Sequence, residues 1–235
     1  MKLASKVVLL FNDSDGLGLA VANSLRLNPS IQNRRREEPF ELSLKADEIN
    51  NRKVAGVLIN FIDEVGTEQV SLMLLERYDP PLLACALNEV VTQIQAGWQF
   101  GASALILPVL NFSSRTMSRE NDITSTKFTL FGHHIGPVTD TSRSIDADTQ
   151  KPSSRLQIQY EPAACMLQLA RLRRIPTSVL IWEALQADLD IEIIGNVGAF
   201  LAKITGLYFS KDHLRWNPRE KTGSNNAEPW QALYG

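Results

Sequence analysis

Apolar and polar positions divide the 235-residue chain into two kinds of segment. Short apolar runs with the composition of buried β-strands stand at 6–11, 54–60, 103–110 and 175–184. The run at 103–110 is continuously apolar after Ser103, which predicts a strand covered on both faces of its sheet. A further strand is expected at 127–131, and the pattern at 70–76 fits either a strand or a helix.

Amphipathic stretches with helical spacing follow several of these runs. Behind Pro80 and Pro81, which suit the first turn of a helix, the apolar side chains recur along one stripe: Leu83, Leu87, Val90, Ile94 and Trp98. Further helices are expected at 16–27, 161–174 and 190–206, the second of them mostly buried. Strands that alternate with such helices predict an α/β fold, a layered sheet with helices on both faces.

The length of the chain favours one domain. We expect a single α/β domain over residues 1–210 and a flexible, extended C-terminal tail over 211–235. Within the domain, 33–41 has the composition of a charged loop. The stretches 111–126 and 139–155 are rich in Ser, Thr, Asp and Asn, which predicts long, mobile loops.

The overall composition is that of an ordinary globular protein, with 44% hydrophobic and 21% charged residues and a formal net charge of −2. This balance gives no general attraction to nucleic acid or to anionic membranes. No apolar run approaches the roughly 20 residues of a membrane span, and the N-terminus lacks the pattern of a secretory signal. Cys85 and Cys165 lie in apolar helical contexts, which favours reduced core residues and a location in the cytoplasm or nucleus.

The most enzyme-like motif follows the first predicted strand. There Gly16-x-Gly18 leads into a helix, as in a dinucleotide-binding turn. Val21 stands where the third glycine of that motif belongs. The carboxylate expected about 20 residues further on would be Glu37 or Glu38, in the charged loop. An ordinary turn is the preferred interpretation, and a nucleotide- or dinucleotide-dependent α/β enzyme remains the alternative.

Other chemistry-bearing side chains form no catalytic or metal-binding pattern. Asp13-x-Asp15-Gly16 resembles the start of a calcium loop, but its later positions lack oxygen ligands. On a strand His133 and His134 would face opposite sides, and His213 is far along the chain, so no metal-ligand spacing results. The remaining candidates fall in predicted loops, without a nucleophile-elbow motif: Asp146, Asp148, Ser153 and Ser154. We therefore predict no catalytic residue, no bound metal and no cofactor.

The last six residues, WQALYG, depart from the pattern of the tail. They follow a polar stretch that has no reason to pack, yet Trp230, Leu233 and Tyr234 are apolar. One hypothesis is that this end folds back onto the domain as an anchor. The other is a tethered ligand, whose aromatic side chains and Gly235 carboxylate enter a partner groove that supplies a lysine and backbone donors.

Two stretches resemble a known family. Leu233-Tyr234-Gly235 is similar to the hydrophobic–Tyr–any-residue terminus of proteasome activators and assembly factors. Residues 160–192 resemble the C-terminal part of the first subunit of the heterodimeric proteasome assembly chaperone. The shared features run in the order Pro162-Ala163-Ala164, Ile175-Pro176 and Asp188-Leu189-Asp190. A weaker likeness covers 82–108, a helix followed by an apolar strand.

This resemblance implies a non-enzymatic α/β chaperone for assembly of the 20S proteasome core particle. It implies a heterodimer with a second, similar chaperone, which binds the proteasome α-ring. The tail would enter a pocket between adjacent α-subunits through Trp230, Leu233, Tyr234 and Gly235. A third hypothesis is a plain scaffold whose tail docks within its own obligate dimer.

Overall fold

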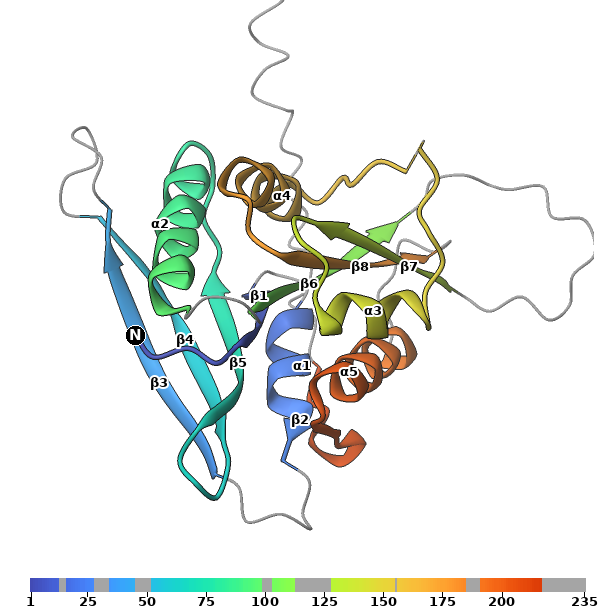
Figure 1. Cartoon of the computed structure of the whole chain (residues 1–235), viewed down its shortest axis with the longest axis horizontal. Helices are drawn as coiled ribbons and strands as arrows, with labels where there is room; N and C mark the ends of the chain where they lie inside the picture. Colours follow the sequence, from blue (N-terminus) through green and yellow to red (C-terminus); the bar gives the residue numbers. More distant parts are fainter. Residues whose placement is uncertain are drawn as a thin grey trace, which may run out of the picture.

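The computed structural model describes the chain in eight stretches: residues 1–12, 16–27, 34–44, 52–98, 103–112, 128–154, 156–184 and 191–216. They form one mixed α/β domain (Figure 1). Seven strands make the main sheet: β1 (Lys6–Asn12), β3 (Arg34–Ser43), β4 (Lys53–Ile62), β5 (Glu68–Glu76), β6 (Ala104–Phe112), β7 (Phe128–Ile135) and β8 (Thr177–Ala184). The short strands β2 (Leu25–Arg26) and β9 (Tyr208–Phe209) pair with each other. Among the described residues no helix is long and apolar enough to span a membrane.

The strand order of the main sheet is β3-β4-β5-β1-β6-β8-β7. The four central strands are parallel, and β3, β4 and β7 are antiparallel to their neighbours. The apolar runs predicted as strands all lie in this sheet, and the undecided run at 70–76 belongs to β5. The prediction for 103–110 is confirmed, since β6 lies between β1 and β8 and its side chains from Ala104 to Val109 are buried.

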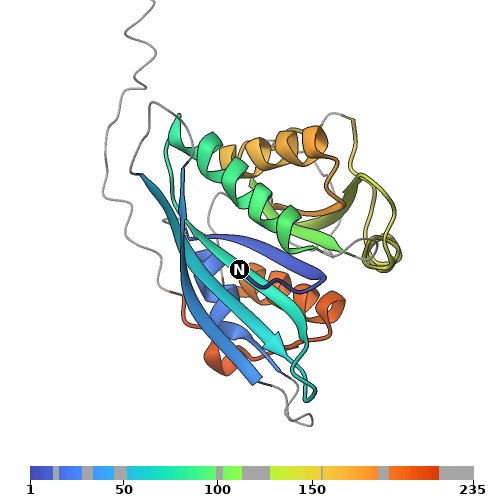
Figure 2. The ribbon, with the colours of Figure 1, turned by 60° about the vertical axis from the view of Figure 1, so that its left-hand side comes forward.

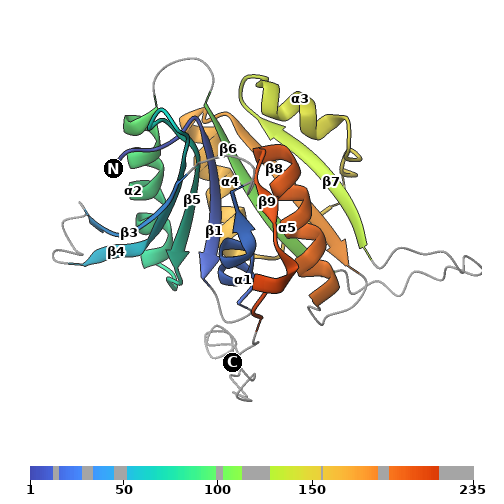
Figure 3. The same ribbon diagram turned by 90° about the horizontal axis from the view of Figure 1, so that it is seen from below.

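Helices cover both faces of the sheet, as predicted. On one face lie α2 (Leu82–Gly97) and α4 (Glu161–Arg173), and on the other α1 (Leu17–Ser24) and α5 (Ile191–Thr205) (Figures 1 and 3). The predicted apolar stripe of α2 is confirmed, because all its members but the half-buried Trp98 are fully buried. Helix α4 is less buried than expected: its sheet-facing side is buried, but Leu172 is 79% exposed.

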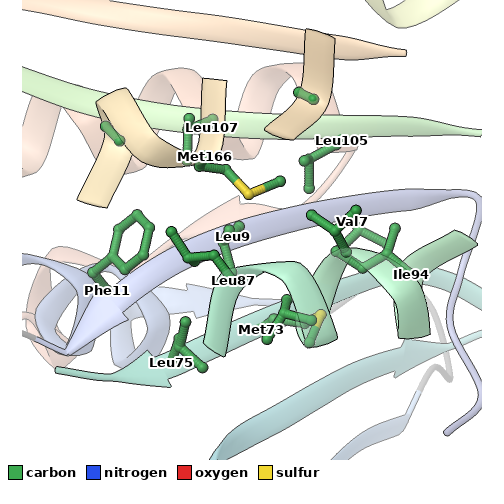
Figure 4. Close-up of a cluster of buried hydrophobic side chains, with 14 of the residues drawn as sticks. Val7, Leu9, Phe11, Met73, Leu75, Leu87, Ile94, Leu105, Leu107 and Met166 are labelled. Carbon is green, nitrogen blue, oxygen red and sulfur yellow. The ribbon is translucent and has the colours of Figure 1, made fainter. Parts of the chain in front are cut away.

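Two hydrophobic clusters meet at β1, one on each face of the sheet. Val7, Leu9 and Phe11 point into the cluster beneath α2 and α4, and Val8 and Leu10 into the cluster beneath α1 and α5. Figure 4 shows the first cluster, in which Leu87 and Ile94 of α2 and Met166 of α4 lie against the strand residues. A strand buried on both faces reads as a continuous apolar run, which explains the pattern at 6–11.

The charged stretch 33–41, expected as a loop, is largely strand β3. It pairs antiparallel with β4 over ten residues, from Arg34 opposite Ile62 to Ser43 opposite Lys53. Figure 2 shows β3 at the outer edge of the sheet, beside β4 and β5. An edge strand exposes much of its surface, so its sequence needs no apolar alternation, and its charges and Pro39 suit an unpaired edge.

The stretch 139–155, expected as a mobile loop, contains helix α3 (Asp140–Asp146), so the prediction of a loop is wrong here. Thr139 and Ser142 form a reciprocal capping box: the Ser142 N–H donates to Thr139 Oγ1 over 3.1 Å, and the Thr139 N–H donates to Ser142 Oγ over 2.9 Å. The fully buried Ile145 anchors the helix. Of the other predicted loop, 111–126, residues Asn111 and Phe112 belong to β6 and the rest lie outside the described residues.

The domain extends beyond residue 210, the predicted boundary with the tail. A short 3₁₀ turn, η1 (Lys211–His213), follows β9, and Leu214 and Trp216 pack against the second hydrophobic cluster. The Ser210 N–H donates to the carbonyl oxygen of Ser24 over 2.9 Å, which fastens this segment beside α1. Residues 211–216 therefore belong to the domain, and 217–235 lie outside the described residues.

The start of α1 depends on two glycines. Gly16 has φ 68°, a left-handed conformation that glycine adopts at no steric cost. At Gly18 the helix comes so close to β1 that a Cβ atom would lie 2.1 Å from the carbonyl oxygen of Phe11. This contact involves backbone, which cannot move aside as a flexible side chain can.

We predict that Gly18→Ala destabilises the domain by about 3 kcal/mol, because the added methyl group forces α1 away from β1. Gly195→Ala on α5 is the matched control: apart from the neighbouring residues and the backbone of α5 itself, no described atom lies within 4 Å of the added Cβ. There the exchange stabilises a helix interior by about 0.5–1 kcal/mol. Urea unfolding tests whether Gly18→Ala lowers the free energy of unfolding and Gly195→Ala raises it. A Gly18→Ala variant as stable as wild type would contradict the close approach.

Candidate functional site

The topology of the parallel strands creates a crevice between β1 and β6. From β1 the chain runs through α1 towards β5 on one side, and from β6 it runs through α3 and α4 to β8 on the other. In open α/β sheets the carboxyl ends of two such diverging strands are the usual place for a ligand. Here the two neighbouring strands also part from each other: their pairing ends at Val8 opposite Ile106, although both continue further.

Pro108 explains why the pairing of β1 and β6 ends early. At the start of β6 the Ala104 N–H donates to the Ser5 carbonyl oxygen, on the side of β1, and the Leu105 N–H donates to the Pro176 carbonyl oxygen, on the side of β8. Every second residue of β6 therefore turns its N–H group towards β1. These residues are Ala104, Ile106 and Pro108. Proline has no N–H to donate, so the ladder towards β1 breaks there. On its other side β6 remains paired with β8 to its end.

A pocket of about 240 Å³ lies at the place where the strands separate. Its walls come from both helical layers and from the ends of both strands: Leu10, Phe11, Leu17, Gly18, Val21, Pro108, Leu110, Asn111, Gln159, Tyr160 and Val197. The rings of Phe11 and Tyr160 meet edge to face, with centroids 5.6 Å apart and planes at 76°. Most of the lining is therefore aliphatic or aromatic, and none of these side chains is charged.

The buried polar side chain of the pocket is Asn111. It is 5% exposed, and its Oδ1 accepts a long hydrogen bond of 3.5 Å from the Gln159 backbone N–H. Within the described part of the chain its amide nitrogen has no hydrogen-bond partner. Sequence reasoning missed this site. Its signals were a proline inside an apolar strand and a polar residue at the carboxyl end of that strand.

The Gly16-x-Gly18 turn borders this pocket but is explained by packing. Gly18 faces the Phe11 carbonyl group and permits the close approach of α1 to β1. In a dinucleotide-binding motif this packing role belongs to the third glycine. Glu37 and Glu38 lie on β3, separated from β1 by β4 and β5, and pair there with Arg35 and Arg36. These carboxylates are therefore remote from the place where a ribose would need them. Asp13 and Asp15 lie outside the described residues.

The two adjacent histidines face opposite sides of β7, as predicted. His133 lies towards α4, and burial together with the charge of Arg171 lowers its pKa, so it is neutral at pH 7. His134 Nε2 lies 2.9 Å from Asp146 Oδ1, and its Nδ1 lies 3.1 Å from Ser178 Oγ. His213 lies elsewhere, 2.9 Å from Ser210 Oγ. Across the described ranges no three His, Cys, Asp or Glu side chains gather as a metal site would require.

The Ser178–His134–Asp146 chain differs from the sequence prediction, which places Asp146 in a loop, whereas the structure places it at the end of α3. It has the residue types of a hydrolytic triad, but Ser178 is only 2% exposed and lies within the sheet. A substrate carbonyl group cannot reach such a hydroxyl. The three side chains instead connect the end of α3 to β7 and β8. Ser153 and Ser154, also considered as nucleophiles, lie in the segment between α3 and α4.

Both cysteines are unpaired and half-buried against the cluster beneath α2 and α4, in agreement with the predicted core positions. Burial, assisted by the charge of Glu161, raises the pKa of the Cys165 thiol. A thiol with a raised pKa stays protonated at neutral pH and is a poor nucleophile.

The predicted partner-binding residues Trp230, Leu233, Tyr234 and Gly235 lie outside the described residues. The structure instead describes the point from which that stretch departs. Leu214 and Trp216 pack on the cluster beneath α1 and α5, so residue 217 follows directly from this layer of the domain.

Several solved structures share this fold. Pyrococcus furiosus PbaB, an archaeal proteasome activator, has a TM-score of 0.53 and 12% identity, over 91% of this chain and 89% of that one. P. furiosus PbaA, an archaeal homolog of proteasome-assembly chaperone, has a TM-score of 0.50 and 15% identity, over 91% and 88%. A proteasome-assembly chaperone homologue from Mycobacterium tuberculosis has a TM-score of 0.52 and 13% identity, over 97% and 99%.

At these identities the likeness concerns the fold, and it extends over nearly the whole of both chains in each pair. No curated protein matches the chain in sequence. The model of one protein family matches residues 1–235, and the chain therefore belongs to that family, described as Domain of unknown function (DUF7894).

Proposed function

We propose that this protein is a non-enzymatic chaperone for assembly of the 20S proteasome core particle. It pairs with a second, related chaperone subunit, and the pair binds the α-ring. Its tail inserts Leu233, Tyr234 and Gly235 into a pocket between two α-subunits, with Trp230 as a further contact. The proposal puts the complex in the cytoplasm or nucleus, where the two free cysteines stay reduced.

The observation that carries this proposal is the full-length fold likeness to PbaA, PbaB and the mycobacterial homologue. It agrees with the resemblance in residues 160–192, which depends on the order of three short motifs. Pro162 stands in the first turn of α4, and Pro176 leads directly into β8. Asp188-Leu189-Asp190 lies outside the described residues.

The segment from which the tail departs, residues 208–216, is the root of the tail and supports a tethered-ligand role. The hydrogen bond from Ser210 to Ser24, the pairing of β9 with β2, and the packing of Trp216 hold this end of the domain in place. From there Asn217 to Pro229 is a linker of thirteen residues, which can span at most about 45 Å. A ligand on a linker of this length acts at a raised local concentration once the domain is bound.

The alternative, a nucleotide- or dinucleotide-dependent enzyme, is less well supported. Its glycine turn serves the packing of α1 on β1, and its expected carboxylates lie at the far edge of the sheet in ion pairs. The described pocket lining offers no charged group for phosphates, and its polar side chains are two amides and a phenol.

We predict that Tyr234→Ala weakens binding to purified 20S particles about tenfold or more. A short extension after Gly235 should do the same, because it converts the Gly235 carboxylate into a peptide group and moves the terminal carboxylate away from Tyr234. Charge-assisted hydrogen bonds contribute about 1.5–3 kcal/mol, and about 1.4 kcal/mol corresponds to a factor of ten. Surface-immobilised 20S particles and purified full-length chain measure the effect.

Tyr208→Ala is the matched control, since it removes a tyrosine that is 53% exposed on the domain itself. It should leave 20S binding unchanged. An extended variant that binds like wild type would refute the carboxylate contact. A fall in the thermal unfolding temperature with Tyr234→Ala would instead favour the folded-back anchor.

We further predict that co-expression with a related α/β chaperone yields a one-to-one heterodimer. Light scattering coupled to size-exclusion chromatography measures its mass. A stable, monodisperse monomer at micromolar concentration, with no complex formed on co-expression, would argue against an obligate pair.

A further inference from the structure

We propose that the pocket between the carboxyl ends of β1 and β6 binds a small, neutral, aromatic carboxamide. The ring lies between the apolar walls, and the amide group pairs with the side chain of Asn111. This site is separate from the tail and does not depend on the proposed function.

The volume of the pocket limits the ligand to one ring with a small substituent. A cavity of about 150 Å³ holds benzene when its walls are apolar, and drug-sized molecules occupy about 300 Å³ or more. At about 240 Å³ this pocket lies between the two. Phe11 and Tyr160 supply aromatic surface, and Leu10, Val21 and Val197 supply aliphatic surface from the layer of α1 and α5.

Asn111 determines the polar chemistry of the ligand. A carboxamide side chain offers two N–H donors and an oxygen with two lone pairs. One lone pair accepts the long hydrogen bond from Gln159, and the donors have no partner in the described part of the chain. A ligand amide satisfies both sides, because its carbonyl oxygen accepts from Asn111 Nδ2 while its N–H donates to Asn111 Oδ1. A bound ligand shields these donors from water, and a shielded donor without a partner is unfavourable, so a carboxamide gains selectivity over a purely apolar ligand.

The described part of the lining disfavours ionised ligands, because it carries no charged side chain. Among the described residues that line the pocket, none is Asp, Glu, Lys, Arg or His. A carboxylate, phosphate or ammonium group that enters this site would lose its hydration without gaining an opposite charge. The pocket therefore favours a neutral amide over the anionic nucleotides that occupy the same position in other α/β sheets.

The test uses four probes of similar size with the full-length chain at pH 7: benzamide, benzoate, benzamidine and ethylbenzene. Saturation-transfer NMR with titration measures each dissociation constant. Benzamide should bind with a dissociation constant of about 0.1–1 mM, which is reasonable for nine non-hydrogen atoms. Benzoate and benzamidine should each bind at least tenfold more weakly.

Two variants identify the site. Asn111→Leu keeps the volume and removes the amide, so benzamide should lose about tenfold in affinity while ethylbenzene keeps its affinity. Leu17→Trp introduces a larger side chain at the pocket wall and should weaken both probes. Asn196→Leu is the matched control, because Asn196 lies beside Val197 on α5 but its side chain bonds the Glu192 carbonyl group outside the pocket. It should change neither affinity.

Several results would overturn the proposal. These are no binding of benzamide to the wild-type chain, equal binding of benzoate or benzamidine, or unchanged benzamide affinity in a folded Asn111→Leu variant. Circular-dichroism melting establishes whether each variant is folded. If Asn111→Leu does not fold, the Leu17→Trp variant and the selectivity of the wild-type chain among the four probes decide. Loss of 20S binding by the tail variants has no bearing on these measurements.

Discussion

The burial of β1 on both of its faces is the constraint on which the domain depends. Val7, Val8 and Leu9 are completely buried, with adjacent side chains entering different hydrophobic clusters. Each helical layer thus packs against the same short strand, and the layers are coupled through it. The close contact of Gly18 with the Phe11 carbonyl group belongs to the same constraint, because α1 must lie nearly on the backbone of β1 to cover Val8 and Leu10.

At its carboxyl end β1 is paired with only one of its two neighbouring strands. Its pairing with β5 continues to Asn12 opposite Glu76, but its pairing with β6 stops at Val8. Pro108 removes the donor that the next step of the ladder requires. The amino-terminal half of β1 is therefore paired on both sides, and its carboxyl-terminal half is unpaired towards β6, where the pocket lies. One strand of seven residues thus packs in the core along its length and contributes to the pocket wall at its carboxyl end.

Sequence reasoning succeeded where burial is extensive and regular, and it failed where burial is slight or local. The strands at 6–11 and 103–110 carry continuous apolar patterns because both of their faces are buried, and α2 carries an apolar stripe because one face is buried along its whole length. Strand β3 has no such pattern, since it lies at an edge and is held mainly by backbone hydrogen bonds to β4. Helix α3 is too short for periodicity. It is specified by Thr139, Ser142 and the buried Ile145 within a polar stretch.

The candidate pocket could not be predicted from the sequence for a related reason. Its lining comes from five places along the chain, and its two amide side chains, Asn111 and Gln159, are 48 residues apart. What the sequence does contain is the cause: a proline in the centre of a buried strand, where central strands rarely tolerate one. The Gly16-x-Gly18 turn beside the pocket resembles a cofactor-binding motif in sequence, but its glycines serve the backbone geometry at the start of α1.

The domain and the tail place different demands on sequence. The domain needs consistent burial over some 200 residues, which very different sequences can supply, and identities of 12–15% with the same architecture illustrate this tolerance. A docking terminus needs only a few residues at a fixed distance from a carboxylate, presented from a fixed root. Under the proposed function, the packing of Leu214 and Trp216 on the layer of α1 and α5 supplies such a root. Recognition by the tail would then change without any change in the core, and a shared fold alone does not determine which partner is bound.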